Sequence, residues 1–543
     1  MKRFKLFLAM AALACAIGLT VKYGSTYRPV VEPVREIEEI WALEDAREES
    51  GEPLVTRLFC NGVPMAYDAE NNVFYGSLGL ENGAQWPEIK LTASEEAAKG
   101  LSLCFADDYG FDDCDAAIRE GYSYQIFAYT DTAYSDAEVV FTGLPLVNVT
   151  ADQTIEREDV PAQIEISLAA EGLQTNGRIH KRGGASILND KVGYKLEFTR
   201  TTDGKKKIYR EIPGMGTDSQ VILLPMNALD TTMMRDRLSW ALYAQLTRRD
   251  EPFSARKTQY CELFLNGEYR GVYLMLEPFS VRQEVAKAGE ERLTTDSVYR
   301  TAVISLSHGR PCMEDPYSAA TGFELYYPMD GEPDFSPLAD YFALLGETDD
   351  AAFMRRAAQI IDLDSALRYD VVLQLFGLTD NVINNMYTWA QNSRGHTRYR
   401  FDFWDLDVSW GLKRDEIGEM HENWVFFPLV DRLLRADEEG GVRKRYGEIY
   451  REVREKAFDA ETVEALVGQY AHELNDSGAM ARNAERWETE NYAADGYELV
   501  AFAAERIALL DEPVRAMSAG EEIDLRFLEK TNYDDKGTPL SEE

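Results

Sequence analysis

The sequence predicts an α+β protein in which a β-rich half precedes a mostly helical half. Short alternating apolar segments such as "EVVFTG" recur in the first half, and this alternation is typical of strands. After about residue 351, segments such as "LDSALRYDVVLQLFGL" place apolar residues at helical spacing. The chain has 543 residues, which suggests roughly two to four domains with ample core.

The N-terminus, residues 1–22, predicts an export signal. Lys2, Arg3 and Lys5 precede an apolar run from Leu6 to Val21. A basic start followed by an apolar core directs export. The run is long for a cleaved leader and short for a full span, so both a cleaved signal peptide and a retained membrane anchor stay open. We therefore expect a secreted or membrane-anchored protein at the cell surface.

The next two segments predict a stalk and a small β domain. Residues 23–53 are polar and charged, which suggests a stalk, linker or short helix. Residues 54–145 carry short alternating segments between turn residues, which predicts a β-sandwich-like domain. Within it, Cys104 and Cys114 either form a disulfide or stay as buried thiols, and the spacing favours neither.

Residues 146–516 predict one larger domain. Strand-like segments lead to a helix over 231–246, with Asp230 as its N-cap, and then to a hairpin over 260–277 that turns at Asn266-Gly267. Helical segments follow, interrupted by a strand pair predicted over 397–412. This β-then-α order is that of a bilobal, protein-kinase-like fold, with a β-rich N-lobe and a helical C-lobe. The last residues, 517–543, predict a charged, frayed tail.

Charge and composition exclude some functions. The chain holds 57 Lys or Arg and 95 Asp or Glu, a net charge of −38. Such a chain repels nucleic-acid backbones, so we expect no nucleic-acid partner. A local metal-loaded pocket can still hold ATP. Only five His are present, and they are scattered, which argues against a zinc site.

The segment "TDNVINNMYTW" contains the spacing of a phosphoryl-transfer loop. Asp380 and Asn385 stand five positions apart, as the catalytic Asp and the metal-binding Asn do in protein kinases. About twenty residues later, "FWDLDVSWG" supplies Asp405 and Asp407, which would share one face if they lay on a strand. A polar helix end explains the first segment alone, but the two together favour a metal site.

A glycine-containing turn lies upstream, in "HKRGGASILNDKVGYKLEF". Backbone amides at such a turn can hold phosphate, and Lys191 enters the following strand within reach of it. Alone, a Gly-Gly pair is usually only a turn, and a lysine is usually only a surface charge.

With these segments, the chain resembles the CotH family of secreted and spore-coat proteins, which are similar to atypical protein kinases. The blocks that carry the resemblance span about 175–412. The two specific ones are "CELFLNGEYRGVYLMLE" and "DNVINNMYTW" with "RFDFWDLDVSWG"; "GRIHKRGGASILNDKVGYKLEF" and "LLPMNALDTTMMRDRLSWAL" add to them. The family turn usually reads Arg-Gly-Asn-Ser-Ser, whereas here Gly184 and Ala185 replace two polar residues. The helix over 231–246 also lacks a Glu, and its only carboxylate is Asp236.

The resemblance implies a role for each residue that matches the family motifs. It implies ATP and Mg²⁺ or Mn²⁺ as cofactors and a protein as the phosphate acceptor. Asp380 would be catalytic, Arg182, Gly183, Lys191 and Glu277 would contact the nucleotide, and Asn385, Asp405 and Asp407 would hold metal.

Three functions fit this reading. The first is an exported Ser/Thr protein kinase, and the second is an inactive surface protein, structural or carbohydrate-associated, on a kinase-like scaffold. The third is AMP transfer from the same nucleotide. The scarcity of ATP outside cells favours the second reading somewhat, whereas the motifs favour the first.

Overall fold

The computed structural model has a mixed α+β architecture, with 35% helix and 33% strand, which confirms the predicted class. The predicted leader, the substituted residue Gly184 and most of the predicted tail lie outside the residues that the structure describes. It describes residues 30–521 apart from 85–88, 95–96, 107–112, 184, 227–229, 247–254, 280–295, 302–321, 329–333, 394–395, 413–423, 426 and 489–494.

The N-terminal part is built on a seven-stranded sheet, with a three-stranded sheet beside it. Residues 31–49 belong to this part rather than to a stalk. Val31 pairs in parallel with Leu103, and Glu48 pairs with Ala133. The sequence prediction missed this because the partners lie far away along the chain. The strands are β1 (Val31–Arg35), β2 (Glu48–Glu49), β5 (Ala66–Asp68), β6 (Val73–Ser77), β8 (Ser102–Ala106), β9 (Ser123–Tyr129) and β10 (Ala133–Thr142), with β3 (Leu58–Cys60), β4 (Val63–Pro64) and β7 (Leu91–Ala93) in the smaller sheet.

Helices α2 (Ile37–Asp45) and α3 (Cys114–Glu120) pack against this part. Ile40 of α2 joins a buried cluster with Cys104, so the predicted short helix lies on the sheet. Cys104 and Cys114 are both buried thiols and form no disulfide, which decides between the two alternatives. Burial raises the pKa of the Cys114 thiol to about 11, so it stays protonated and unreactive at neutral pH.

The following segment closes into a seven-stranded barrel. Parallel pairing of Val147 with Leu263 joins its first strand to a later one. Interior and exterior residues alternate, as in the strand where Tyr194 and Leu196 are buried in the barrel core and Lys195 faces outward between them. The strands, in spatial order, are β11 (Leu146–Thr150), β12 (Val160–Leu168), β13 (Glu171–Arg182), β14 (Gly193–Thr199), β17 (Gln220–Leu224), β19 (Glu268–Leu276) and β18 (Thr258–Leu265).

The predicted hairpin is confirmed as β18 and β19. Asn266 and Gly267 both have positive φ, +54° and +77°, which suits a tight turn between antiparallel strands. The predicted helix is also present, but it begins four residues later, as α4 (Arg235–Leu246). Asp230 does cap this segment, because its carboxylate accepts hydrogen bonds from the amides of Thr232 and Arg235, each at 3.1 Å.

The C-terminal half is mostly helical around a four-stranded sheet. The predicted strand pair over 397–412 is wrong in its bounds, because the last strand of the sheet ends at Phe403 and its partner precedes it. The strands are β20 (Ser297–Thr301), β21 (Phe323–Tyr327), β22 (Met386–Ser393) and β23 (His396–Phe403). The helices are α6 (Ala339–Leu345), α7 (Asp350–Ile360), α8 (Leu363–Phe376), α9 (Asp380–Ile383), α10 (Pro428–Arg435), α11 (Gly441–Lys456), α12 (Ala460–Asp476), α13 (Ala479–Arg486) and α14 (Tyr497–Ser518).

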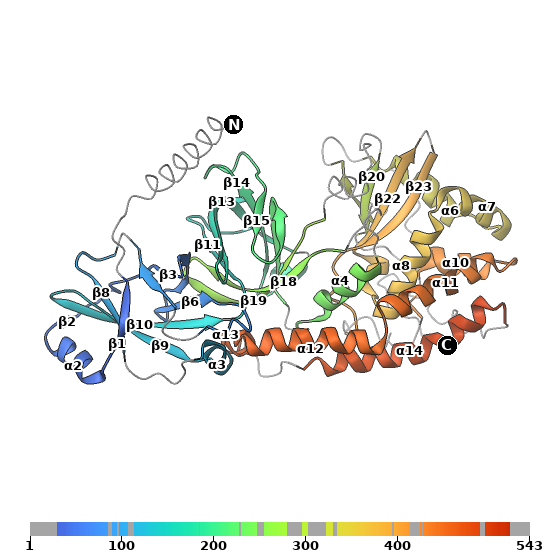
Figure 1. The fold of residues 1–543 in the computed structure, drawn as a ribbon. Helices are drawn as coiled ribbons and strands as arrows, with labels where there is room; N and C mark the ends of the chain where they lie inside the picture. The colour runs from blue at the N-terminus through green and yellow to red at the C-terminus, as the bar shows by residue number, and fades with distance from the viewer. Residues whose placement is uncertain are drawn as a thin grey trace, which may run out of the picture.

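The C-terminal helices join all three parts (Figure 1). Helix α12 runs from the helical half beneath the barrel, and α13 packs against β19. The hydroxyl of Thr142, in the N-terminal part, donates to the carbonyl of Ser477 at 3.2 Å. Within the described part of the chain, no helix is both long enough and apolar enough to cross a membrane.

Candidate functional site

The segment around Asp380 is shaped by the end of α8. That helix stops at Gly377, which adopts a left-handed φ of +66°, and a Cβ there would lie 2.8 Å from the Phe502 ring. The chain then turns through the buried Leu378 into α9, a single turn that opens at Asp380. The sequence therefore ends a long helix and reverses within three residues, which places the polar side chains at the edge of the sheet.

Asp380 and Asn385 are in direct contact. The side-chain amide of Asn385 donates to Asp380 Oδ2 at 2.8 Å, and the side-chain amide of Asn384 donates to Asp380 Oδ1 at 3.1 Å. Asp380 is buried, with 3% of its surface exposed, whereas Asn385 is half-buried. The five-residue spacing thus brings the predicted catalytic carboxylate and the predicted metal-binding amide together. Asn385 itself has φ of +59°, a conformation that Asn tolerates better than most residues.

Asp405 lies next to this pair, but not on a strand. Strand β23 ends at Phe403, and Asp405 and Asp407 follow it in an irregular segment, so the predicted shared strand face does not exist. The Trp404 amide donates to the carbonyl of Asn385 at 3.0 Å, which joins the two segments through their backbones. Asp405 has φ of +58° and is half-buried, as is Asp407.

Two side chains hold the backbone on either side of Asp405. The amide of the buried Asn381 donates to the carbonyl of Trp404 at 2.7 Å. On the other side, the amide of Leu406 donates to Asp236 Oδ1 at 3.2 Å. A left-handed Asp costs conformational energy, and such strain persists only where the surroundings fix it. Asn381 and Asp236 provide that fixation.

Asp236 brings a second carboxylate close to Asp405. It lies in the first turn of α4 and is buried. Burial, and then the negative charge of Asp405, raise the pKa of Asp236 to about 7. The sequence shows Asp236 only as the one carboxylate of its helix, and its neighbour stands about 170 residues further along the chain. No local signal could have found the pair.

Arg182 is the predicted nucleotide residue that reaches this area. Its guanidinium carbon lies 5.5 Å from the centre of the Trp404 ring, which precedes Asp405. Gly183 follows with φ of +130°, a conformation that favours glycine, and a Cβ there would collide with the Ser186 hydroxyl. The Arg-Gly pair therefore turns the chain sharply where β13 ends beside the acidic segment.

Lys191, the lysine predicted to contact the nucleotide, has its ammonium bound by other groups of the protein. Its ammonium donates to the carbonyl of Val272 at 2.7 Å and to Asn483 Oδ1 at 2.8 Å. The rings of Tyr273 and Trp487 lie 5.0 and 5.9 Å from it. Burial lowers its pKa well below the usual value. All of these contacts are to β19 and to α13 with its C-cap, so Lys191 fastens a C-terminal helix to the barrel.

Lys195, four residues later, is the lysine on the side of the barrel that faces the helical half. Its cross-strand neighbour Ile222 packs in the core of that half, and the charge of Arg182 acts on it. Burial, reinforced by Lys207 and Arg182, lowers its pKa. It forms no hydrogen bond or ion pair with any described residue. The sequence analysis missed Lys195, although strand alternation in "YKLEF" predicts that it faces away from the barrel core.

Glu277 marks the passage from the barrel to the helical half. It follows the last residue of β19, and its carboxylate accepts a hydrogen bond from the amide of Lys257 at 3.2 Å. Two residues later, the Phe279 ring stacks on Tyr387 of the four-stranded sheet, with ring centres 4.2 Å apart. Glu277 therefore stands at the connection between the barrel and the helical half, and the resemblance implies that it contacts the nucleotide.

Arg235 sits behind the acidic segment rather than within it. Its Nε donates to the carbonyl of Ser409 at 3.1 Å, and its other nitrogens pair with Asp230 and Glu498. These bonds fasten α4 to the segment after Asp405 and to α14. The Arg235 guanidinium is already paired with two carboxylates, so Arg235 helps to hold the candidate site in position.

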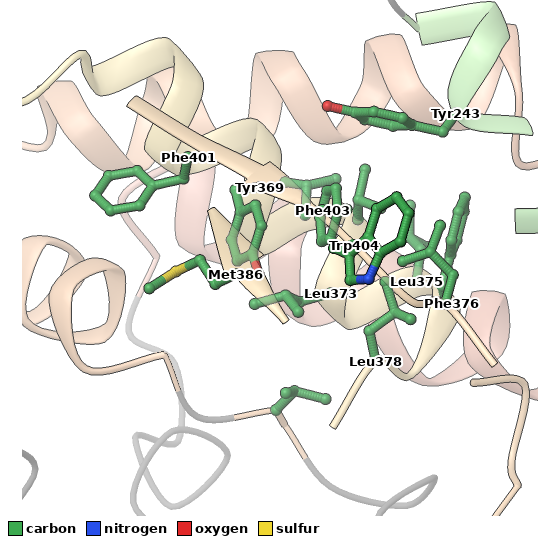
Figure 2. Close-up of a cluster of buried hydrophobic side chains, with 14 of the residues drawn as sticks. Tyr243, Tyr369, Leu373, Leu375, Phe376, Leu378, Met386, Phe401, Phe403 and Trp404 are labelled. Atoms are coloured by element: carbon green, nitrogen blue, oxygen red, sulfur yellow. The ribbon is translucent and has the colours of Figure 1, made fainter. Parts of the chain in front are cut away.

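Buried aromatic side chains form a layer next to these segments, and Figure 2 shows part of this layer. Tyr369 stacks on Phe403 with ring centres 4.1 Å apart, and Trp404 lies beside them. The Tyr369 hydroxyl donates to the carbonyl of Asn381 at 2.7 Å. The buried layer therefore supports the turn that carries Asp380 as well as the segment that carries Asp405.

The donor set suits a hard cation, since carboxylate and amide oxygens are the ligands that Mg²⁺ prefers. Among the described residues, no group of three or more His, Cys, Asp or Glu converges closely enough to form a metal cage by itself. Mg²⁺ often takes only one or two protein carboxylates and completes its shell with phosphate and water. Asp405 with Asn385 fits that mode of binding.

Comparison with known proteins agrees with the motifs. No curated protein matches the chain. The family model described as CotH kinase protein matches residues 179–510, which include α4, the Asp380 segment and the Asp405 segment. The match begins within β13, covers more than half of the chain, and leaves the N-terminal sheet outside it. The chain therefore belongs to the CotH kinase family.

Proposed function

We propose that this chain is an exported protein kinase that transfers the γ-phosphoryl group of ATP to a Ser or Thr hydroxyl of a surface or coat protein. The observation that carries the proposal is the contact between Asp380 and Asn385, joined through the backbone to Asp405. A phosphoryl-transfer site needs this combination, an Asp at the acceptor hydroxyl beside oxygen ligands for metal.

Asp380 would accept the proton of the acceptor hydroxyl. Its carboxylate is oriented by the amides of Asn384 and Asn385, and the aromatic layer below fixes its backbone. A general base must be held within reach of the proton that it removes. The hydrogen bonds from Asn384 and Asn385 hold the Asp380 carboxylate in place for that role.

The metal would be held by Asp405 and the Asn385 side chain, with Asp407 as a further ligand. The proximity of Asp236 supports this, because the negative charge of Asp405 raises the pKa of Asp236 and a divalent cation would relieve that repulsion. ATP with Mg²⁺ or Mn²⁺ supplies the reactive phosphoryl group and neutralises its charge. The chain's own residues position the acceptor and receive its proton.

Arg182 and Lys195 would bind the phosphates. Both lie on the face of the barrel toward the helical half, and Arg182 already contacts Trp404. This reassigns the lysine role from Lys191, whose ammonium is occupied by Val272 and Asn483. Glu277 and the adjoining end of β19 would lie along the adenine.

The test uses the full chain with ATP labelled at the γ position, Mn²⁺ or Mg²⁺, and a panel of Ser- and Thr-containing proteins. We expect label in the acceptor from the wild-type chain, and none above background from Asp380→Ala or Asp405→Ala. Circular dichroism of each variant checks that it is folded. Asp340→Ala, on the exposed face of α6, is the matched control and should label normally.

Other outcomes identify the alternatives. Label transferred from the α position but not the γ position would indicate AMP transfer. No nucleotide binding and no label, with a folded wild-type chain, would contradict the kinase proposal and favour an inactive scaffold. The basic and apolar start of the sequence supports export, and cell fractionation of the full chain with and without residues 1–22 tests that part.

A further inference from the structure

Positive charge is concentrated in one part of this acidic chain. Residues 178–210 contain ten Lys or Arg against three Asp or Glu, although the whole chain has a net charge of −38. This segment covers the end of β13, β14 and the connection that follows. The rest of the chain is therefore even more acidic, and the contrast gives the barrel a local positive field.

The connection over residues 200–210, here called the basic loop, has a backbone conformation that is held by hydrogen bonds. The Arg200 amide donates to the carbonyl of Lys206 at 2.8 Å, and the Ile208 amide donates to the carbonyl of Phe198 at 3.0 Å. Gly204 turns with φ of +70° against the side chain of Arg178. These bonds hold the backbone of the basic loop in one conformation, and they thereby fix where its cations are attached.

The basic loop presents cations that have no ion-pair partner among the described residues. Lys205 and Lys207 pair with Asp203 and Glu197, but no described carboxylate lies within ion-pair distance of Arg200, Lys206 or Arg210. All three are exposed, and so is the ring of Tyr209, at 59%. Arginines beside an exposed tyrosine are the residue types enriched at protein interfaces.

Further cations connect the basic loop to the candidate site. The charges of Lys207 and Arg182 both act on Lys195, which lies between them on the outer face of the barrel. Arg182 then reaches Trp404, beside Asp405. A partner held on the basic loop is therefore on the same wall of the barrel as the residues that face the site.

We propose that the basic loop is a docking surface for an acidic segment of the protein acceptor. This rests on the proposed function, because it names the class of acceptor that the same site would use. Carboxylates of the acceptor would pair with Arg200, Lys206 and Arg210, and the docked segment would run along the barrel wall toward Asp380.

A short acidic segment fits better than a long polyanion. The basic loop offers only a few free cations, and the remaining surface of the chain would repel an extended negative polymer. A short acidic segment can place its carboxylates on the basic loop. The neighbouring part of the acceptor can then be uncharged, so that the acidic surface of the chain does not repel it. Tyr209 adds a contact for an apolar or aromatic side chain of such a segment.

Binding can be measured without turnover. A fluorescent peptide with a run of Glu beside one Ser, and its twin with Gln in place of Glu, are titrated with the full chain and followed by anisotropy. We expect the Glu peptide to bind more tightly and to weaken as salt rises. The double variant Lys206→Glu with Arg210→Glu should bind the Glu peptide roughly tenfold more weakly, since two exposed ion pairs are lost.

The matched control is Lys444→Glu with Arg451→Glu, two exposed cations on α11 that have no described carboxylate partner. This pair should leave binding unchanged. In kinase assays, the basic-loop variant should raise KM for the Glu peptide while kcat and the KM for ATP stay constant. A normal affinity in the basic-loop variant would overturn the proposal.

Two results separate this proposal from the kinase proposal. Loop-dependent binding of the Glu peptide with no phosphate transfer would support the docking surface and contradict the kinase function. Phosphate transfer to the Gln twin as efficient as to the Glu peptide would do the reverse. Inorganic polyphosphate is the third probe, and loop-dependent binding of polyphosphate without binding of the Glu peptide would overturn the acidic-protein assignment.

Discussion

Two buried carboxylates of this chain, Glu262 and Asp236, have opposite electrostatic surroundings. Glu262, on β18, accepts two hydrogen bonds from the Arg482 guanidinium, at 2.9 and 2.8 Å, and one from Tyr269. Burial alone would raise its pKa, but Arg482 holds that pKa below the usual value. Asp236 instead lies beside Asp405, and its pKa is raised.

The difference separates a structural carboxylate from a candidate functional one. A buried charge that serves only the fold comes with its own counter-charge, because an unpaired ion in the interior is costly. Two neighbouring carboxylates hold unfavourable charge that a bound cation would relieve. Glu262 joins the barrel to α13, whereas Asp236 belongs to the proposed nucleotide and metal site.

The largest expected effect comes from breaking the balanced pair. Arg482→Leu leaves Glu262 buried without its cation, and removal of one partner of a buried pair costs about 3–5 kcal/mol. We expect the free energy of unfolding in urea to fall by that amount. The double variant with Glu262→Leu should recover most of it. A small loss in the single variant would mean that Glu262 is not charged in the folded chain.

Next comes the pair formed by Asp236 and Asp405. Asp236→Asn keeps an oxygen for the Leu406 amide but removes one negative charge near Asp405. We expect Mn²⁺ affinity, measured by titration with nucleotide present, to fall about 10- to 100-fold, as for other residues that support metal ligands. The fold should be at least as stable at pH 8. Unchanged Mn²⁺ affinity would place Asp236 outside the site.

A third buried carboxylate tests whether a raised pKa alone indicates function. Asp370 on α8 accepts hydrogen bonds from Tyr446 at 2.8 Å and from Gln374 at 3.3 Å, and burial raises its pKa to about 8. The folded chain therefore holds a proton there that the unfolded chain has lost. Its contribution to stability falls as pH rises from about 4 to about 8.

Asp370→Asn should remove that pH dependence. At pH 8 we expect the variant to be more stable by roughly 2 kcal/mol, because no buried charge has to form. The measurement is the unfolding free energy in urea at pH 5 and pH 8. Kinase activity should not change, since Asp370 is held by Tyr446 within the helical core. Equal stability of both proteins at pH 8 would contradict the raised pKa.

The smallest expected effect compares the two lysines of "KVGYKLEF". Lys195→Met should raise the KM for ATP by about tenfold, the value of one lost charged contact, with little change in stability. Lys191→Met should instead lower the melting temperature and leave the KM for ATP nearly unchanged. The reverse pattern would restore the role predicted for Lys191 from the sequence.

The sequence predicted those parts of the fold and site that depend on local patterns. The hairpin at Asn266-Gly267 follows from turn chemistry, and the contact of Asp380 with Asn385 follows from spacing within one turn. The sequence could not decide which of Lys191 and Lys195 faces the site, because the predicted start of a strand is uncertain by several residues. Moving that start by a few residues exchanges the lysine that faces the site for one that faces a helix.

Other features depend on contacts between distant segments, which no local pattern encodes. Asp236 meets Leu406 only after α4 packs against the end of β23. The parallel pairing of β1 with β8 likewise joins segments that other strands and helices separate along the chain. The strand predicted for Asp405 failed because a left-handed residue ends the alternation there.

The left-handed conformation of Asn385 and Asp405 limits which amino acids these two positions accept. Gly, Asn and Asp adopt this conformation at low cost, and two of these three also provide oxygen ligands. Chemical need and conformational need therefore select nearly the same residues. Glycine is the informative exception, because Asp405→Gly preserves the path of the chain while it deletes the carboxylate. At this position a single substitution separates the shape of the site from its chemistry.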